Sequence, residues 1–485
     1  MRMEYLVFLL AYFLLVLGLS FGFARRQNNL EDYFLASRKL PWGLVYVSLG
    51  ASWLGATSVL VSVEQAFSEG IGAVWVMMIP ALVTVSVLAL FLSGPIRRLT
   101  RATLPELVEQ RYGRGVRHAA AVLIVWYMIL LASSQMVAIG GLIRHSLGVS
   151  FINGLLIGTG VVLVYSAFGG LFSVVLTDGL QLGLLIIGGG GLFGLLWNRG
   201  GGAAAFSVAG FSGRPGYTDI FSGIETNGLM ALSFVMAWLI SPIAWQRIQA
   251  ASSERSARRG LWAAGGTFLA AYAGLIAIGM MAYLQGIFPR PGEPLMFTLL
   301  ELSSNPALSG VFFVAVMAAV MSTMDTALNT GAFSLTHDVW RQIFPTSRDG
   351  SLVLVSRLAT LIIGGLALLI ALRFQSILKT LGLSAEIMAE GLFIPGILML
   401  FQKKKRPTAG LLSLLLGGGF ALLGFFCEVG WLGWDLPDWP HSLPYGVGLS
   451  LAGFLAGACW DRHRPRLGAR RFPTDAKGNE RNAPE

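Results

Sequence analysis

The sequence predicts an all-α protein that crosses a membrane about thirteen times. Three observations carry this prediction: 55% of the 485 residues are hydrophobic, only 12% are charged, and long apolar runs recur along the whole chain. A soluble globular chain carries about 25% charged residues, so this chain has too little charge to cover a water-facing surface. Its net charge of +10 lies in short basic runs between apolar segments, as in cytoplasmic loops, which disfavours nucleic-acid binding.

The apolar segments have the length of about 20 residues that spans a bilayer. They fall near 4–24, 42–67, 72–94, 119–143, 150–168, 173–197, 226–246, 260–284, 307–334, 352–372, 377–402, 408–427 and 444–460. The first segment ends in Arg25 and Arg26 rather than in a small-residue cleavage site, so we expect a membrane helix and not a signal peptide. The tail after Arg464 is polar and is expected to be disordered.

Basic residues concentrate in alternate connections between these segments. The connections "QRIQAASSERSARRG" and "QKKKRP" are basic, whereas "EVGWLGWDLPDWPHS" is acidic. Because Lys and Arg favour the cytoplasmic side of a membrane, we expect an outside N-terminus and a cytoplasmic C-terminus. The implied location is the bacterial cytoplasmic (inner) membrane.

Two blocks of five segments organise the middle of the chain, and their odd number gives them opposite orientations. Each block opens with an interrupted segment, "GASWLGATS" in the first and "AWLISPIAW" in the second, where Pro242 should break the helix. Such a pair indicates an inverted-repeat transporter with a site at the membrane midplane. The expected units are residues 1–41 (first span and loop), 42–225 and 226–406 (the repeats), 407–460 (two accessory spans) and 461–485 (tail).

Four stretches resemble the sodium/solute symporter family, which includes the sodium/proline and sodium/sugar symporters. In the family's order they are "EDYFLASRKLPW" (31–42), "TLPELVEQRYG" (103–113), "YSAFGGLFSVVLTDGLQ" (165–181) and "AAVMSTMDTALN" (318–329). The resemblance implies the five-plus-five inverted-repeat fold of amino-acid/sodium symporters. It also implies co-transport of sodium with a small organic solute (an amino acid, sugar, monocarboxylate or amine), with no enzymatic activity and no obligate protein partner.

The fourth stretch places oxygen atoms on one face of a helix. Ala319, Ser322 and Thr323 have i, i+3, i+4 spacing, and the resemblance implies that they form half of a sodium site. Main-chain carbonyls at the first interruption, which align with Ala51 and Leu54, would form the other half. The alternative is that both hydroxyls bond to carbonyls of their own helix; the resemblance favours sodium.

Two aspartates accompany this predicted site. Asp325 is expected to face the packed interior and to bond to Asn329, and it is either structural or supports the ion site without contacting the ion. Asp178 matches an acidic residue that the family pattern links to sodium coupling. Its alternative role is that of a carboxylate near a helix N-terminus, stabilised by the helix dipole, and the two interpretations stay open.

The substrate signatures of the known branches are not intact. The proline branch has an aspartate where this chain has Trp53, and the sugar branch has polar side chains where this chain has Gly55, Thr57 and Ser58. With Trp238 and Ser241 of the second interrupted segment, these residues are the candidate substrate site, and the solute stays undetermined.

Glu386 and Glu390 extend this candidate site, because they lie at i, i+4 near membrane depth in a segment that lines the substrate cavity in the family. A charge at the bilayer centre costs about 2.5–3.5 kcal/mol, so a substrate or proton role is expected and a proton-coupled or cation transporter is the main alternative function. The structural alternative pairs Glu386 with Lys379. Glu64 is expected to be a solvated vestibule charge.

Two other classes of function fit the sequence less well. A membrane sensor built on a transporter scaffold would carry a cytoplasmic kinase domain, for which we expect the tail of about 25 residues to be too short. An intramembrane enzyme is disfavoured, because no histidine and neither cysteine (Cys427, Cys459) is expected at membrane depth.

The expected topology is testable by labelling. With the two native cysteines replaced, a cysteine placed near Asp435 should react with an impermeant reagent from outside intact cells, and a reporter fused after Glu485 should read cytoplasmic. Labelling near Asp435 only after permeabilisation would contradict the thirteen-span topology.

Overall fold

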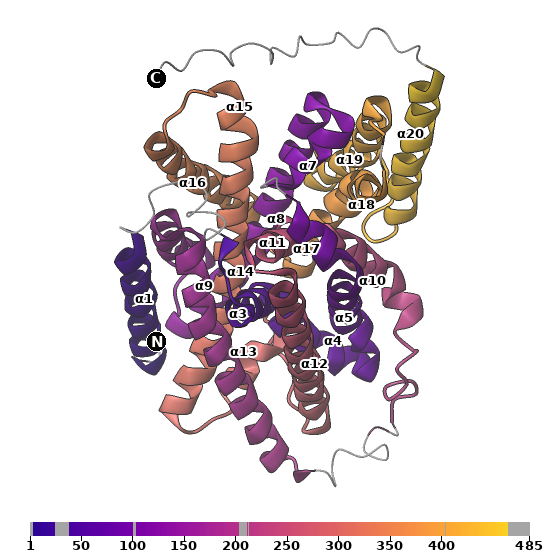
Figure 1. Cartoon of the computed structure of the whole chain (residues 1–485). Coiled ribbons are helices and arrows are strands. Elements are labelled where there is room, and N and C mark those ends of the chain that lie inside the picture. The colour runs from indigo at the N-terminus through magenta and orange to yellow at the C-terminus, as the bar shows by residue number, and fades with distance from the viewer. Residues whose placement is uncertain are drawn as a thin grey trace, which may run out of the picture.

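The computed structural model describes residues 3–24, 38–99, 103–202, 211, 213–402 and 404–463. All regular elements in these ranges are helices. The expected disorder of the tail and most of the stretch 31–42 lie outside the described residues. Figure 1 shows the bundle, with α1 at one edge against α9 and with α19 and α20 at the opposite edge.

The helices follow the predicted apolar segments closely. Their bounds are α1 Met3–Ala24, α3 Trp42–Trp53, α4 Ser62–Glu69, α5 Met78–Val87, α6 Ser93–Arg98, α7 Leu104–Tyr112, α8 Arg114–Leu147, α9 Phe151–Arg199, α10 Ile224–Leu239, α11 Pro242–Ala250, α12 Glu254–Leu284, α13 Leu295–Leu300, α14 Pro306–Phe333, α15 Arg341–Ile343, α16 Asp349–Arg373, α17 Ile377–Glu386, α18 Phe393–Phe401, α19 Pro407–Val429 and α20 Leu443–His463. Wider π-helical turns link several of them: η2 Thr57–Val61, η4 Leu88–Leu92, η7 Ser334–Trp340 and η8 Ile387–Leu392.

Twelve helices within the described ranges are long and apolar enough to cross a membrane, and one of them contains two crossings. This run, Thr57–Arg98, has 42 residues, about twice the number needed to span a bilayer, and it reverses at Gly70, whose φ is 72°. Leu40 N–H bonds to Ala250 O at 3.0 Å and Arg97 Nε to Ala251 O at 2.6 Å, so both flanks of the region lie beside the start of α12.

The other end of α12 locates the reversal. Gly279, near the end of α12, packs against Val63 and Ala66 of α4. The chain therefore crosses once through α3 and α4 and returns through α5 and α6. Counted this way, the described residues make thirteen crossings, as the sequence predicts.

Two crossings are interrupted where the sequence suggested. α3 ends at Trp53, the following Leu54 has a non-helical ψ of 58°, and helix resumes at Thr57. α10 ends at Leu239 and α11 begins at Pro242, because proline has no N–H to continue a helical ladder. α9 holds two further predicted crossings, separated at Gly170, whose φ of 59° and ψ of 178° interrupt the helix.

Helix α14 forms the centre of the bundle. It packs against α8, α9, α3 and α1, and every side chain from Phe312 to Phe333 is buried. Its polar residues therefore face other helices and not lipid, which is the condition for tolerating them in a membrane.

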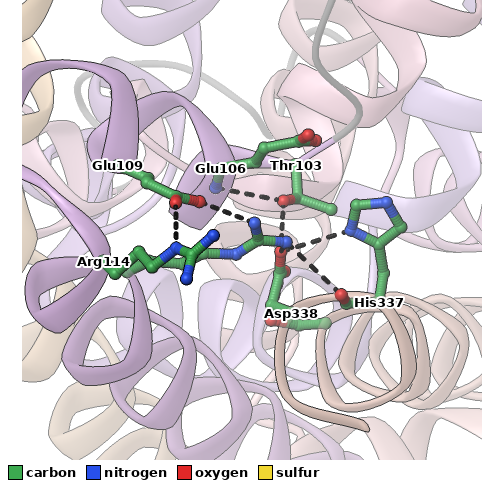
Figure 2. A network of polar contacts seen from close by, with 8 residues as sticks. Thr103, Glu106, Glu109, Arg114, His337 and Asp338 are labelled. Atoms are coloured by element: carbon green, nitrogen blue, oxygen red, sulfur yellow. Dashed lines mark hydrogen bonds and ion pairs between the residues drawn. The ribbon is translucent and has the colours of Figure 1, made fainter. Parts of the chain in front are cut away.

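The stretch 103–113 contributes Thr103 and Glu109 to a buried ionic cluster with Arg117 and Asp338, which we call the α7–η7 clasp. Thr103 caps α7 by accepting from the N–H of Glu106 at 3.2 Å and donates to Asp338 Oδ1 at 2.6 Å. Arg117 of α8 reaches Asp338 at 3.0 Å and Glu109 at 2.7 Å. Figure 2 shows Thr103 and Glu109 facing His337 and Asp338 across this contact. The clasp ties α7 and α8 to the extension of α14, on the side that the basic loops predict to be cytoplasmic.

We expect the clasp to stabilise the fold strongly. Asp338→Asn would remove the fully buried counter-charge of Arg117, whose side chain is 5% exposed, and leave it only the ion pair with the partly exposed Glu109. Leaving a buried charge with no partner costs about 3–5 kcal/mol, and the remaining pair should reduce this cost without cancelling it, so the melting temperature in detergent should fall. Arg114→Gln is the matched control, because the Arg114 side chain is 85% exposed and lies 3.6 Å from Glu109; an equal loss of stability in both variants would argue against the buried pair as the cause.

Candidate functional site

The predicted ion site is built where the interruption after α3 meets the middle of α14. Ser322 Oγ donates to Ala51 O and to Ala319 O, at 2.9 Å each. Thr323 Oγ1 lies 3.0 Å from Ser52 O and 3.4 Å from Ala319 O. Both hydroxyls therefore reach carbonyls of their own helix and also carbonyls of α3. Leu54, the remaining predicted member, is fully buried and directly follows the last residue of α3.

Glycine at position 55 permits this close approach. A Cβ atom built on Gly55 would overlap Thr323 Oγ1 and would lie 2.7 Å from Gln135 Oε1. Gln135, on α8, accepts from the main-chain N–H of Ala56 at 2.8 Å. The side chain of Gln135 thus satisfies a backbone group that the interrupted helix leaves without a helical partner.

A small central cavity of about 40 Å³ lies beside these oxygens. Six of the eight residues proposed for substrate binding line it: Trp53, Gly55, Thr57, Ser58, Trp238 and Ser241. Thr323 lines it as well, so one hydroxyl belongs both to the predicted ion site and to the cavity wall.

The cavity combines aromatic faces with neutral polar groups. Trp53 stacks on Phe268 with ring centroids 5.6 Å apart and also meets Trp238 at 5.6 Å. Ser58 Oγ bonds to Tyr272 Oη at 2.8 Å, whereas the buried hydroxyl of Thr57 has no hydrogen-bond partner. Among the described residues no acidic or basic side chain lines this cavity.

Asp178 belongs to a buried polar network next to the ion site. Its carboxylate accepts from Ser48 Oγ at 2.7 Å, and Arg247 Nε donates to the same Ser48 oxygen at 3.1 Å. Arg247 also reaches Thr326 at 3.2 Å, which in turn lies 2.9 Å from Ser52. Asp178 lies eight residues beyond the Gly170 break, so it is not in the first turn of its helix and the helix-terminus interpretation is wrong.

Asp325 is buried in the interior as expected, but its predicted partner is wrong. It accepts from Ser166 of α9 at 2.5 Å, whereas the side-chain oxygen of Asn329 has no partner. The i, i+4 spacing made the contact with Asn329 possible, and the tight packing of α14 on α9 provides Ser166 instead.

Glu386 and Glu390 do not reach the central cavity, which corrects the sequence-based placement. Both turn toward the accessory helices: Ser442, just before α20, donates to Glu386, and Gly446 of α20 packs against the carboxylate of Glu390. The predicted pairing of Lys379 with Glu386 is also wrong, because Lys379 forms an ion pair with Glu428 of α19. Leu381 is the residue of α17 that lines the cavity.

Several residues of the site were missed by reasoning from the sequence. Gln135 and Tyr127 come from α8, Met77 precedes α5, and Ser52 supplies a carbonyl to Thr323. One signal was available for Gln135: the polar triplet 133–135 interrupts an otherwise apolar run in α8. Glu64 is placed as expected, since it lines a wide depression of about 780 Å³ together with Leu378, one helical turn before Leu381.

The described residues form an all-helical bundle with two interrupted crossings beside a central cavity. This architecture is typical of secondary transporters. Comparison with known proteins assigns the chain within this class. A model of the sodium:solute symporter family matches residues 33–418, and the chain belongs to that family; it is a transporter-family protein and not an enzyme.

Curated relatives span nearly the whole chain. The high-affinity proline transporter PutP of Bacillus subtilis is 26% identical over 443 residues, which cover 88% of this chain and 92% of the relative. A sodium/glucose cotransporter of Vibrio parahaemolyticus is 27% identical over 457 residues, covering 85% and 83%.

Solved structures share the fold. A sodium-coupled sialic acid symporter in a substrate-bound outward-open state superposes with a TM-score of 0.77 at 18% identity, covering 95% of this chain and 97% of that one. Mhp1, a nucleobase-cation-symport-1 family transporter, superposes with a TM-score of 0.55 at 14% identity, covering 90% and 95%. These likenesses establish the five-plus-five helical fold.

The close approach at Gly55 generates a prediction. Gly55→Ala should destabilise the protein by about 1–3 kcal/mol, because the added methyl group overpacks a filled site and pushes Thr323 and Gln135 away from the interruption. Gly43→Ala is the control, because a Cβ at Gly43 meets open space. Melting temperatures in detergent measure the difference, and equal values for both variants would show that position 55 is not tightly packed.

Proposed function

We propose that this chain is a sodium-coupled symporter that imports a small organic solute by alternating access. One observation carries the proposal: the hydroxyls of Ser322 and Thr323 bond to carbonyls of α3 within three residues of its interruption. In an intact helix these carbonyls accept bonds from their own helix, so the interruption is what frees oxygen atoms at this depth.

Sodium is the proposed co-transported ion. Its ligands would be the carbonyl oxygens of Ala51, Leu54 and Ala319 and the hydroxyl oxygens of Ser322 and Thr323. Neutral oxygen atoms suit a hard cation, and the set holds no nitrogen or sulfur atom that would favour a transition metal. The names of the relatives, which include sodium/proline and sodium/glucose transporters, support the same ion.

The solute is proposed to bind in the central cavity against Trp53 and Trp238, with Gly55, Thr57, Ser58 and Ser241 around it. A solute seated there touches the wall that Thr323 shares with the ion site. Each ligand would then stabilise the arrangement that the other one needs, which is the thermodynamic content of coupling. A cavity without charged side chains offers no counter-charge to a solute that carries a net charge, so it favours sugars and zwitterionic amino acids over amines and monocarboxylates.

Asp178 is proposed to couple the ion site to the rest of the bundle. The path Asp178–Ser48–Arg247–Thr326–Ser52 is continuous at 2.7 to 3.2 Å and ends one residue from Ala51. It joins α9, α3, α11 and α14, so a shift of any of these helices is felt by the carbonyls around the ion.

Alternating access would be the relative movement of two repeats, residues 42–225 and 226–406. With the N-terminus outside and the C-terminus in the cytoplasm, the depression beside Glu64 is the outer entrance and the α7–η7 clasp closes the inner side. One sodium ion moving down about 100 mV and a tenfold gradient supplies about 3.7 kcal/mol, which supports accumulation of roughly 500-fold.

Uptake into proteoliposomes tests the proposal. Labelled amino acids, sugars, monocarboxylates and amines, each with and without a sodium gradient, should identify one class whose uptake requires sodium.

With that solute, Ser322→Ala and Thr323→Ala should each raise the sodium concentration for half-maximal uptake by about tenfold or more, because a lost bond to a charged group is worth about 1.5–3 kcal/mol. Ser309→Ala is the control, since Ser309 is buried in the first turn of α14 and bonds to Ser303 O at 3.2 Å. Unchanged sodium dependence in both site variants would reject the site.

A further inference from the structure

Glu390 is the least satisfied acidic residue among those the structure describes. Its side chain is 0% exposed, and neither carboxylate oxygen has a hydrogen-bond partner. Gly446 of α20 packs against the carboxylate, and Gly417 of α19 packs against the main-chain carbonyl of Glu390. Any side chain at position 446 would overlap the carboxylate, so the two accessory helices form a fitted cradle around this residue.

An unpaired ionised carboxylate cannot be kept in such a place, because burying it without a partner costs far more than the stability of a domain allows. No basic side chain in the described part of the chain contacts it. Lys379 of α17 forms its ion pair with Glu428 of α19. The other charged groups around the site, Glu386 and Asp438, are acidic. Glu390 must therefore be neutralised by a bound ion.

A path for that ion leads to solvent through two neighbours. Ser442, four residues before Gly446, donates to Glu386 and also lies against Glu390. Glu386 lines a depression of about 640 Å³ together with Glu428, Asp435 and Asp438, and the last two are exposed. Once Glu386 is protonated, the Ser442 hydroxyl can turn from Glu386 to Glu390; the Glu386 proton then passes to the Ser442 oxygen while the Ser442 hydroxyl proton passes to Glu390, and Glu386 returns to its ionised form.

We propose that Glu390, Ser442 and Glu386 form a proton-binding site between η8 and α20, separate from the central cavity and loaded from this acidic depression. A proton suits the site better than a metal cation, because the cradle is closed by glycine backbone and offers a single hydroxyl beside the two carboxyl groups.

The position of the site links it to transport, and this step rests on the proposed function. Glu390 lies in the π-helical segment η8, and such wide turns occur preferentially at functional sites. η8 continues α17, whose Leu381 lines the central cavity. A proton on Glu390 holds this helix against α19 and α20, and loss of the proton places a buried charge there and drives the helices apart. Import should therefore slow as the pH rises.

The first test needs no transport. Above about pH 5 an unfolded glutamate is ionised, so a native state that keeps one proton on Glu390 loses stability with rising pH, by up to tenfold in its folding equilibrium per pH unit. The melting temperature of the wild type should fall between pH 6 and 8.5, and Glu390→Gln, which carries an amide of the same size, should fall less. Glu225→Gln, at an exposed position of α10, should follow the wild type.

Parallel curves for the wild type and Glu390→Gln would overturn the proton site. So would a stability difference between them that follows sodium concentration and not pH, since it would assign the site to sodium.

The second test measures initial uptake from pH 5.5 to 8.5 at saturating sodium. The wild-type and Glu225→Gln rates should fall several-fold across this range, and the Glu390→Gln rate should stay nearly level. Identical profiles would overturn the link to transport. If no labelled solute is taken up at all, the proposed function fails, and the melting series still decides the proton site.

Discussion

The constraint on which this structure depends is that every backbone polar group at membrane depth needs a partner inside the protein. The chain violates helical continuity at Leu54 and again at Ser241, and each violation leaves amides and carbonyls without helical partners. The hydroxyls of Ser322 and Thr323 donate to carbonyls of α3, and the side-chain oxygen of Gln135 accepts from the amide of Ala56. The polar side chains of α14 and the interruption of α3 can therefore be buried in a membrane only because each satisfies the other. Their hydrogen bonds also hold α3 against α14.

The same rule explains how buried charges are distributed. Arg247 is fully buried, and hydroxyl groups of Ser48 and Thr326 surround its guanidinium within reach of Asp178 and Asp325. Arg117 is surrounded in the same way by Asp338 and Glu109. Both clusters join helices that are distant in sequence, so they specify which helices meet and hold the bundle in one arrangement. The proposed movement of the repeats would require such contacts to exchange partners, because losing them outright costs several kcal/mol each.

Sequence reasoning reached the spans, the interruptions and several of the residues that line the central cavity, because these follow from local patterns. Apolar length sets the crossings, Pro242 sets one break, and the spacing of Ala319, Ser322 and Thr323 sets a shared face. It failed where the partner comes from elsewhere in the chain. The spacing of Glu386 and Glu390 gave a common face correctly but could not say that α20 covers this face. For the same reason, the sequence did not predict that Asp325 bonds to Ser166 or that Lys379 pairs with Glu428.

The acidic site shows how the accessory helices differ from the transport core. The family match ends at residue 418, and Ser442 and Gly446 lie beyond it. Glu386 and Glu390 lie in the predicted second repeat, within the matched residues, so the proposed site is completed by residues beyond the family match. A helix pair that only filled the bilayer would need neither a hydroxyl facing a carboxylate nor a glycine that makes room for one. Because α19 and α20 contact η8, which continues the helix that lines the cavity, the proposed proton site is placed to act on the proposed transport cycle.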